Sequence, residues 1–266
     1  MRTNKRPYIY QPENNLYNIF EKSCANKMNI KRVIRSRIRN WELHLSKTSK
    51  KRYINYLRKQ GVKIGENIWM TPCIKTVNID ITRPSLVEIG DYVRIDRNFT
   101  LLTHDAGFYV LLNKWHEFIP QSGKVKIGNN VYFARNCTVF KGVTIGDNCI
   151  IGFGSVVTHD IPANSVAVGV PARVVGTVED YYKKRSTKCI SEALAYAKSI
   201  EERFHRKPRL DEFWEEFPLF VDKENMHLYP HLPYKRQLRD SFDYWVEHHK
   251  RIYDGFEEFL KAAGIE

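Results

Sequence analysis

A strict six-residue period runs through residues 125–175 and limits what this chain can fold into more than any other feature. The period is marked by large apolar residues at every sixth position: Ile127, Phe133, Val139, Ile145, Ile151 and Val157. Neither a helix of 3.6 residues per turn nor a strand of period two requires a repeat of six. A coiled β-structure does, with one short strand and one corner in each hexad, so the repeat predicts a parallel β-helix.

Three hexads make one coil of 18 residues, so residues 18 apart are expected to stack on one another. The predicted stacked pairs are Ile127 and Ile145, Phe133 and Ile151, and Val139 and Val157. The chain must turn sharply at each corner, and glycine takes such backbone angles without steric cost. The glycines predicted at corners are Gly128, Gly142, Gly146, Gly152 and Gly154.

The composition suits a globular chain, with 42% hydrophobic residues among 266. No apolar run approaches the roughly 20 residues that span a bilayer, and the first residues lack the apolar segment of a signal peptide. The five cysteines are an odd number without metal-type spacing. We therefore expect free thiols and a cytoplasmic protein. Peripheral attachment to the inner face of the membrane is compatible with this location.

The net charge of +13 belongs to residues 1–60, which hold 16 Lys and Arg against 3 Glu, while the rest of the chain balances. Apolar residues recur there at helical steps: Ile30, Val33, Ile34, Ile38, Trp41 and Leu45. Such a basic helix can bind an anionic membrane surface or a polyanionic acceptor. It can equally pack its apolar stripe on the open end of the β-helix, which we favour. A nucleic-acid partner is not expected.

The chain divides into three predicted parts. Residues 1–60 form a basic helical segment, with Ser49 expected to cap a helix that Gly61 ends. Residues 61–176 form the β-helix, and residues 177–266 form a helical extension in which 233–264 has the pattern of an amphipathic helix. The in-phase residues Leu101 and Ile127 are 26 apart, which is not a multiple of six, so a loop at about 104–124 is inserted in the β-helix.

The chain resembles the hexapeptide-repeat acyltransferases. The resemblance rests on the hexads, on the phrases IGNN at 127–130 and IGDN at 145–148, and on the exit DIPANSVAVGVPARVV at 160–175. It implies a left-handed β-helix, a homotrimer and acetyl-CoA as the acyl donor. The handedness comes from the resemblance alone, because crossover connections are ordinarily right-handed.

The resemblance also implies a catalytic base. In this family the histidine at the junction of coil and extruded loop takes the proton of the acceptor, and His104 stands at that junction. Histidine suits proton transfer near neutral pH. Its second ring nitrogen must be held, and Asp105 or Asp96 can serve. Asp80 and Arg83 are candidate acceptor-site residues.

The inserted loop is rich in aromatic residues. Phe108, Tyr109 and Trp115 can stack on a sugar ring, or they can form the loop's own small core.

By the same resemblance, the donor groove follows successive coils. The matching positions are Tyr132, Ala134, Gly152, Phe153, Thr158, His159 and Arg173. Arg173 matches a basic residue that binds the donor's phosphates. The chain departs from the family at His159, where lysine is frequent, and at Phe153, where a small residue is frequent.

The expected reaction is acetyl transfer to a hydroxyl of a sugar or polysaccharide precursor. The alternatives are N-acetylation of an amino sugar or small amine, and a non-catalytic β-helix that binds a partner. The γ-class carbonic anhydrases use the same coiled fold to bind zinc through a close histidine pair and a third histidine. His104 stands alone in its coil, so no metal site is expected.

Overall fold

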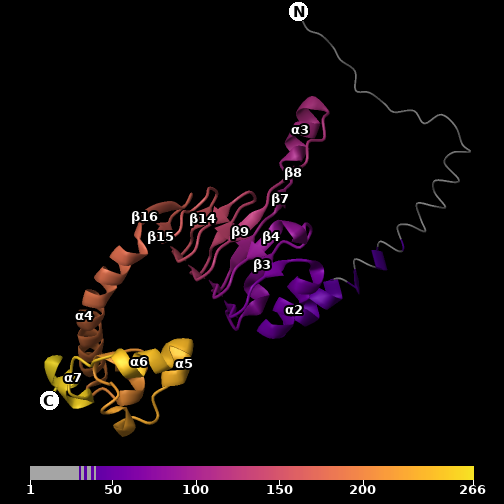
Figure 1. Cartoon of the computed structure of the whole chain (residues 1–266). Helices are drawn as coiled ribbons and strands as arrows, with labels where there is room; N and C mark the ends of the chain where they lie inside the picture. The colour runs from indigo at the N-terminus through magenta and orange to yellow at the C-terminus, as the bar shows by residue number, and fades with distance from the viewer. Residues whose placement is uncertain (1–29, 31–32, 35–36, 39) are drawn as a thin grey trace, which may run out of the picture. The chain divides into compact units, whose positions relative to one another are not determined.

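The computed structural model of the protein describes residues 30, 33–34, 37–38 and 40–266. The chain forms two compact units, one ending at Val178 and the other spanning Glu179–Glu266 (Figure 1).

The first unit is a coil of short parallel strands that form three sheets. The first sheet is β1 (Lys63–Ile64), β4 (Val87–Ile89), β9 (Val125–Ile127) and β12 (Thr144–Ile145). The second is β2 (Trp69–Met70), β5 (Arg94–Ile95), β10 (Val131–Phe133), β13 (Cys149–Ile151), β15 (Ser165–Val168) and β16 (Arg173–Thr177), of which β16 is antiparallel to β15. The third is β3 (Val77–Ile79), β6 (Phe99–Leu101), β11 (Thr138–Val139) and β14 (Val156–Val157).

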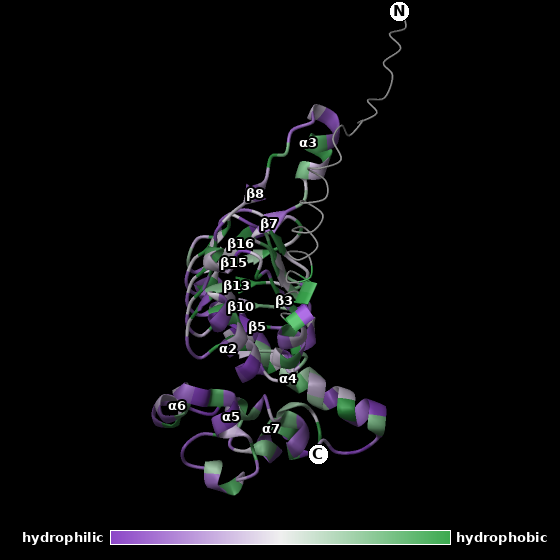
Figure 2. Cartoon of the chain, turned by 90° about the vertical axis from the view of Figure 1, so that its right-hand side faces the viewer, coloured by the Kyte–Doolittle hydropathy of each residue, from purple (hydrophilic) through white to green (hydrophobic). Residues whose placement is uncertain are grey.

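The predicted stacking of hexads is confirmed. Ile127 pairs with Ile145, Phe133 with Ile151, and Val139 with Val157, each at the same register position of neighbouring parallel strands. The ladder continues through the earlier coils, where Ile89 pairs with Ile127 and Leu101 with Val139. These side chains are almost fully buried, and Figure 2 shows hydrophobic segments within the stack of coils. The hexads therefore supply both the register and the core.

The corners are held by asparagine more than by glycine. Left-handed backbone angles occur at Asn67, Asn98, Asn130, Asn136, Asn148 and Asn164. Asparagine tolerates this conformation because its short side chain bonds locally. Here it also bonds between coils: Asn130 donates to Asn148 over 2.9 Å, and Asn148 donates to Asn164 over 3.0 Å.

Of the glycines predicted at corners, only Gly142 and Gly154 take positive φ. Gly128 serves a different purpose, because a Cβ there would lie 2.8 Å from the amide nitrogen of Asp147 in the next coil. Gly146 and Gly152 likewise face atoms of the next coil at close range. Their role is close approach between coils.

The inserted segment is an arm with secondary structure of its own. Strands β7 (His104–Asp105) and β8 (Gln121–Ser122) pair antiparallel at its base, and helix α3 (Phe108–Trp115) lies beyond them. Figure 1 shows α3 standing away from the coil. The sequence indicated the insertion, while its helix was not predicted.

The N-terminal part of the described chain packs on the coil through α2 (Lys50–Gln60). Ser49 caps this helix and Gly61 ends it in a left-handed conformation, as predicted. Tyr53, Tyr56 and Leu57 are buried in the core that α2 shares with the first coils.

The apolar stripe that precedes α2 is exposed, which corrects the packing that we favoured. Exposure is 64% at Trp41 and 41–59% at the other members, Ile30, Val33, Ile34, Ile38 and Leu45. None of the described helices has an apolar stretch long enough to cross a membrane.

The second unit is helical and aromatic. Its helices are α4 (Val178–Phe204), α5 (Tyr234–Leu238), α6 (Phe242–His248) and α7 (Phe256–Ala262), with short 3₁₀ turns between them. Phe213, Phe217, Phe220 and Phe259 form the centre of its core. The single helix predicted over 233–264 is wrong, because the backbone turns to positive φ at Arg239 and Gly255.

Candidate active site

His104 and Asp80 meet where two neighbouring strands of the third sheet end. β3 ends at Ile79 and β6 at Leu101, and these residues are register partners, so Asp80 lies beside the start of the arm. Asp80 Oδ2 lies 2.7 Å from Nδ1 of His104. The Thr82 hydroxyl is 3.1 Å from the same nitrogen. Because a ring nitrogen that faces a carboxylate carries the proton, Nε2 is left as the basic nitrogen.

Asp80 is a nearly buried carboxylate, with 7% of its side chain exposed. Burial raises its pKa, but the hydroxyl and amide of Thr103 and those of Thr82 donate hydrogen bonds that together hold the pKa well below its ordinary value. Asp80 is therefore a permanent anion that fixes the orientation of His104.

This geometry corrects the predicted partner of His104. The expected carboxylates were Asp105 and Asp96, and both have other partners. Asp105 forms an ion pair with Lys141 at the base of the arm. Asp96 lies 3.5 Å from Arg135 and accepts a hydrogen bond from the amide of Arg97. Asp80, expected in the acceptor site, holds the histidine instead.

A pocket opens beside His104. It is lined by Leu43, Lys47, Tyr53, Asn78, Ile79, Asp80, Thr100, Leu101, Leu102 and His104. His104 keeps 34% of its side chain exposed here, so a substrate can reach the ring. The pocket thus joins the candidate base to side chains from the N-terminal segment and from two strands.

The other acceptor-site candidates lie outside this pocket. Arg83 caps the short 3₁₀ turn Pro84–Leu86, and its side chain has no ion pair among the described residues. In the arm, the ring of Phe108 packs at 4.4 Å from those of both Tyr109 and Phe118. These rings contact one another, but no residue of α3 is buried, so they do not form a closed core.

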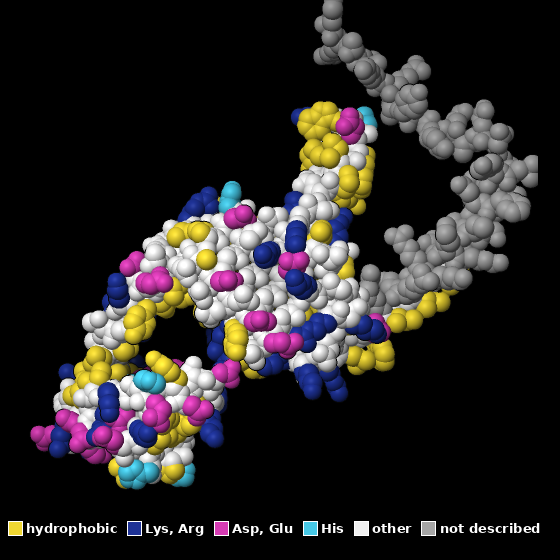
Figure 3. Space-filling view, in the orientation of Figure 1, with side chains coloured by type: hydrophobic (Ala, Val, Ile, Leu, Met, Phe, Trp, Pro, Cys, Tyr) yellow, Lys and Arg dark blue, Asp and Glu magenta, His cyan; other side chains and the backbone are white. Residues whose placement is uncertain are grey.

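Trp115 lies at the end of α3, with the Lys114 ammonium over its ring. The surface of the arm is largely hydrophobic, as Figure 3 shows, and Tyr109 and Trp115 are more than half exposed.

Five of the seven predicted donor positions lie on the second sheet or on the corners that follow it. Tyr132 is in β10, and Ala134 and Gly152 occupy equivalent places in successive coils, since each donates its amide to the next coil. Gly152 must be small, because a Cβ there would lie 2.5 Å from Val168. The corner residue Phe153 is 70% exposed, so its ring does not fill the coil.

Thr158 and His159 follow β14. This strand belongs to the third sheet, whose strand β6 precedes His104. Oγ1 of Thr158 lies 2.8 Å from Nδ1 of His159. Arg173 is exposed in β16, and its guanidinium donates to the carbonyl of Ala172. Within the described chain, none of the donor positions contacts His104.

Sequence reasoning missed the residues that support the base. Thr82 follows Asp80 by two residues, the spacing at which an aspartate bonds the backbone ahead of it, and this signal was available. Thr103 and Lys47 carried none. Among residues 40–266, no group of three or more His, Cys, Asp or Glu side chains is placed to hold a metal ion.

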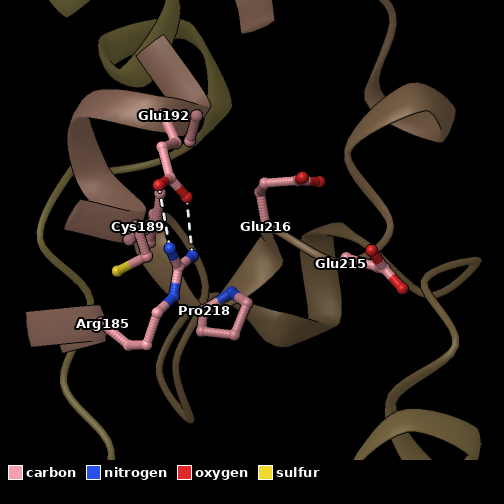
Figure 4. A pocket seen from close by; sticks show the side chains of 8 residues that line it. Arg185, Cys189, Glu192, Glu215, Glu216 and Pro218 are labelled. Carbon is pink, nitrogen blue, oxygen red and sulfur yellow. Dashed lines mark hydrogen bonds and ion pairs between the residues drawn. The ribbon is translucent and has the colours of Figure 1, made fainter. Parts of the chain in front are cut away.

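The second unit has a pocket of another kind (Figure 4). Arg185 and Glu192 form an ion pair there at 2.6 Å. Beside them, burial raises the pKa of Glu216. No histidine lines this pocket, so it has no counterpart of the His104 arrangement.

Comparison with known proteins agrees with the hexad repeat. The family described as "Bacterial transferase hexapeptide (six repeats)" matches residues 123–159. The "Galactoside O-acetyltransferase" of Escherichia coli K12 is 36% identical over 147 residues, which cover 48% of this chain and 71% of that protein. "Protein CapG" of Staphylococcus aureus is 32% identical over 132 residues, covering 48% and 73%. The chain belongs to the family of hexapeptide-repeat acetyltransferases.

Two solved structures align with about half of the chain. A galactoside acetyltransferase in complex with coenzyme A is 28% identical, with a TM-score of 0.40, over 56% of this chain and 82% of that one. A maltose O-acetyltransferase from Clostridium difficile 630 is 28% identical, with a TM-score of 0.39, over 53% of this chain and 84% of that one.

Proposed function

We propose that this protein transfers an acetyl group from acetyl-CoA directly to a hydroxyl of a sugar or polysaccharide precursor, with His104 as the general base. The observation that carries the proposal is the 2.7 Å contact between Asp80 and His104, beside a pocket open to a substrate. The membership of the chain in an acetyltransferase family supplies the reaction class, and its sugar-acetylating relative supports the acceptor class.

The proposed step needs one base and no covalent enzyme intermediate. Nε2 of His104 takes the proton of the acceptor hydroxyl as its oxygen attacks the thioester carbonyl carbon. The carbon–sulfur bond then breaks, the acetyl group stays on the oxygen, and the leaving thiolate takes up the proton. Asp80 holds the ring through Nδ1 and stabilises the imidazolium that forms in between.

The donor groove follows from the family. Tyr132, Ala134, Gly152 and Phe153 would flank the pantetheine arm, and Arg173 would meet the phosphates. His159, in place of lysine, weakens the phosphate site. A left-handed coil and a homotrimer, with the groove between neighbouring subunits, belong to the same proposal.

An N-acetyltransferase would use the same base on an amine, and it remains the second candidate. A non-catalytic binding module does not need a histidine held by a buried carboxylate, so the Asp80–His104 contact argues against it.

The exposed stripe that precedes α2 favours a surface role for the N-terminal segment. Residues 27–39 hold six Lys and Arg and no acid. A basic helix with an exposed apolar stripe suits the interface of an anionic membrane, so we place the enzyme at such a surface.

The test is acetyl-CoA turnover by His104→Ala, measured as thiol release over a panel of sugars, nucleotide sugars and amino sugars. We expect turnover to fall by about 10²- to 10⁴-fold while coenzyme A affinity, from isothermal titration, stays the same. His116→Ala is the matched control, because His116 lies exposed at the end of α3. Near-normal turnover by His104→Ala would overturn the assignment, and acetylation of amines alone would select the second candidate.

A further inference from the structure

Lys47 brings a positive charge from the N-terminal segment to the pocket of His104. Its Nζ donates to the carbonyl of Val77 over 2.9 Å and to Oδ1 of Asn78 over 3.0 Å, both on β3. Lys47 lines the same pocket as His104 and Asp80. The strand that ends beside the base therefore also holds this cation.

The cation has no anionic partner among the described residues. Both of its hydrogen-bond acceptors are neutral, and an ammonium has three N–H donors, so one remains. Asp80 lines the same pocket but forms no ion pair with Lys47 among the described residues, and its two oxygens accept bonds from Thr82, Thr103 and His104.

Leu43 and Leu102 give the pocket a partly apolar wall. Nζ of Lys47 lies over the Tyr53 ring, 5.4 Å from its centroid, and this contact attracts the cation without neutralising its charge. Burial lowers the pKa of Lys47, since the ammonium has lost part of its hydration. An anion bound here would offset the hydration energy that the ammonium has lost. The partly apolar wall would strengthen the electrostatic attraction between the anion and the ammonium.

We infer that the acceptor is an anionic sugar, whose carboxylate or phosphate binds Lys47 while a hydroxyl of the same sugar reaches His104. The inference rests on the proposed acetyl transfer and deepens it. A neutral sugar can offer a hydroxyl oxygen to the third donor of Lys47, but it leaves the charge without a counter-ion. An anionic sugar supplies both the acceptor and the counter-charge, and it fixes which hydroxyl faces the base.

The experiment uses the full chain and compares acceptors that differ at C6, where a carboxylate or a phosphate ester stands in place of the free hydroxyl. Methyl glucuronide is paired with methyl glucoside, and glucose 6-phosphate with glucose, so that the carboxylate and phosphate arms are separate. We expect kcat/KM to favour the anionic member of at least one pair, and Lys47→Met to reduce it for that member by about 10- to 100-fold, as for loss of a hydrogen bond to a charged group. Turnover of the neutral member should fall by a smaller factor, so that the preference for the anionic member is reduced.

Three further measurements separate the possible failures. Lys75→Met, an exposed lysine in the turn before β3, is the control for loss of one positive charge. Lys47→Arg keeps the charge and should retain the preference for the anionic sugar, and thermal unfolding reports whether Lys47 only fastens the helix to β3. Direct titration of each sugar, without acetyl-CoA, reads the site independently of catalysis.

Equal use of charged and neutral sugars, or equal losses for both in Lys47→Met, would overturn the inference and leave the acetyltransferase intact. Binding of an anionic sugar that depends on Lys47, without thiol release from any acceptor, would overturn the proposed function and keep the anion site.

Discussion

Asp80 Oδ2 accepts a hydrogen bond from Nδ1 of His104 at 2.7 Å, although the two residues are 24 positions apart and belong to neighbouring coils. The parallel register of β3 and β6 brings them together, because both follow the last residue of a paired strand. Their contact makes the orientation of the base a property of the coil rather than of the arm that follows it.

Asp80→Asn should lower kcat by about 10²- to 10⁴-fold, because an amide does not fix which ring nitrogen carries the proton. The KM for acetyl-CoA should stay the same, since Asp80 lies away from the donor positions. Steady-state kinetics with Asp105→Asn and Asp96→Asn provide the comparison. Those carboxylates bond Lys141 and Arg135 instead, so both variants should retain kcat within about tenfold. An equal loss in all three would contradict the assignment of Asp80.

The low pKa of Asp80 has a consequence for stability in acid. A carboxylate whose folded-state pKa lies below its unfolded value of about 3.9 contributes stability that is present above that value and is lost as the pH falls through the folded one. Asp80→Asn lacks this contribution. The difference in unfolding temperature between wild type and Asp80→Asn should therefore narrow as the pH falls below about 4. A difference independent of pH down to 3 would show that the carboxylate is not stabilised by its hydrogen bonds.

The hexads predicted the coil well because core stacking is periodic and local: Ile127, Ile145 and their neighbours are determined by counting. The active site follows a different spacing. Ile79 and Leu101 are register partners 22 residues apart, four more than one coil, because the turn Pro84–Leu86 lengthens one corner. Counting hexads therefore could not place Asp80 beside His104.

The junction itself was visible in the sequence, because the insertion breaks the hexad phase and His104 marks the break. The contribution of Lys47 was not visible, since it depends on how a helix outside the repeat packs on β3. The role of the aromatic segments was equally ambiguous, because the sequence of an apolar stripe does not show which surface packs against it.

Gly128→Ala tests the close approach of the coils. A methyl group at Gly128 would lie 2.8 Å from backbone atoms of Gly146 and Asp147, which cannot move without disturbing the next strand. We expect a loss of about 1–3 kcal/mol in the free energy of unfolding. Gly176→Ala is the control, because a Cβ there meets no atom within 4 Å, and it should stay within about 0.5 kcal/mol. Chemical denaturation measures both, and equal effects would contradict the packing argument.

The cysteines should differ in reactivity by position. Burial raises the pKa of the Cys137 thiol to about 11 and also raises that of Cys149, and both side chains are inside the coil. Cys73 is exposed. Iodoacetamide at about pH 8 should label Cys73 and leave Cys137 and Cys149 unmodified until denaturant is added, as read by peptide mass spectrometry. Rapid labelling of Cys137 in the native protein would show that the coil opens.

The exposed stripe predicts binding to anionic membranes. Trp41 and Ile38 are more than half exposed, and their neighbours in the sequence are basic. The protein should sediment with vesicles that contain phosphatidylserine and not with neutral ones. Binding should weaken as ionic strength rises from about 0.1 to about 1 M, because the Debye length falls from about 10 to about 3 Å. A double variant, Ile38→Ser with Trp41→Ser, should bind less because it buries less apolar surface in the interface.

Trp115→Ser is the control for that measurement. Trp115 is as exposed as the stripe but lies at the end of α3, in the arm. If Trp115→Ser weakens vesicle binding as much as the double variant does, the attachment is a general effect of exposed aromatic residues. If only the stripe matters, the N-terminal segment holds the enzyme at the membrane surface.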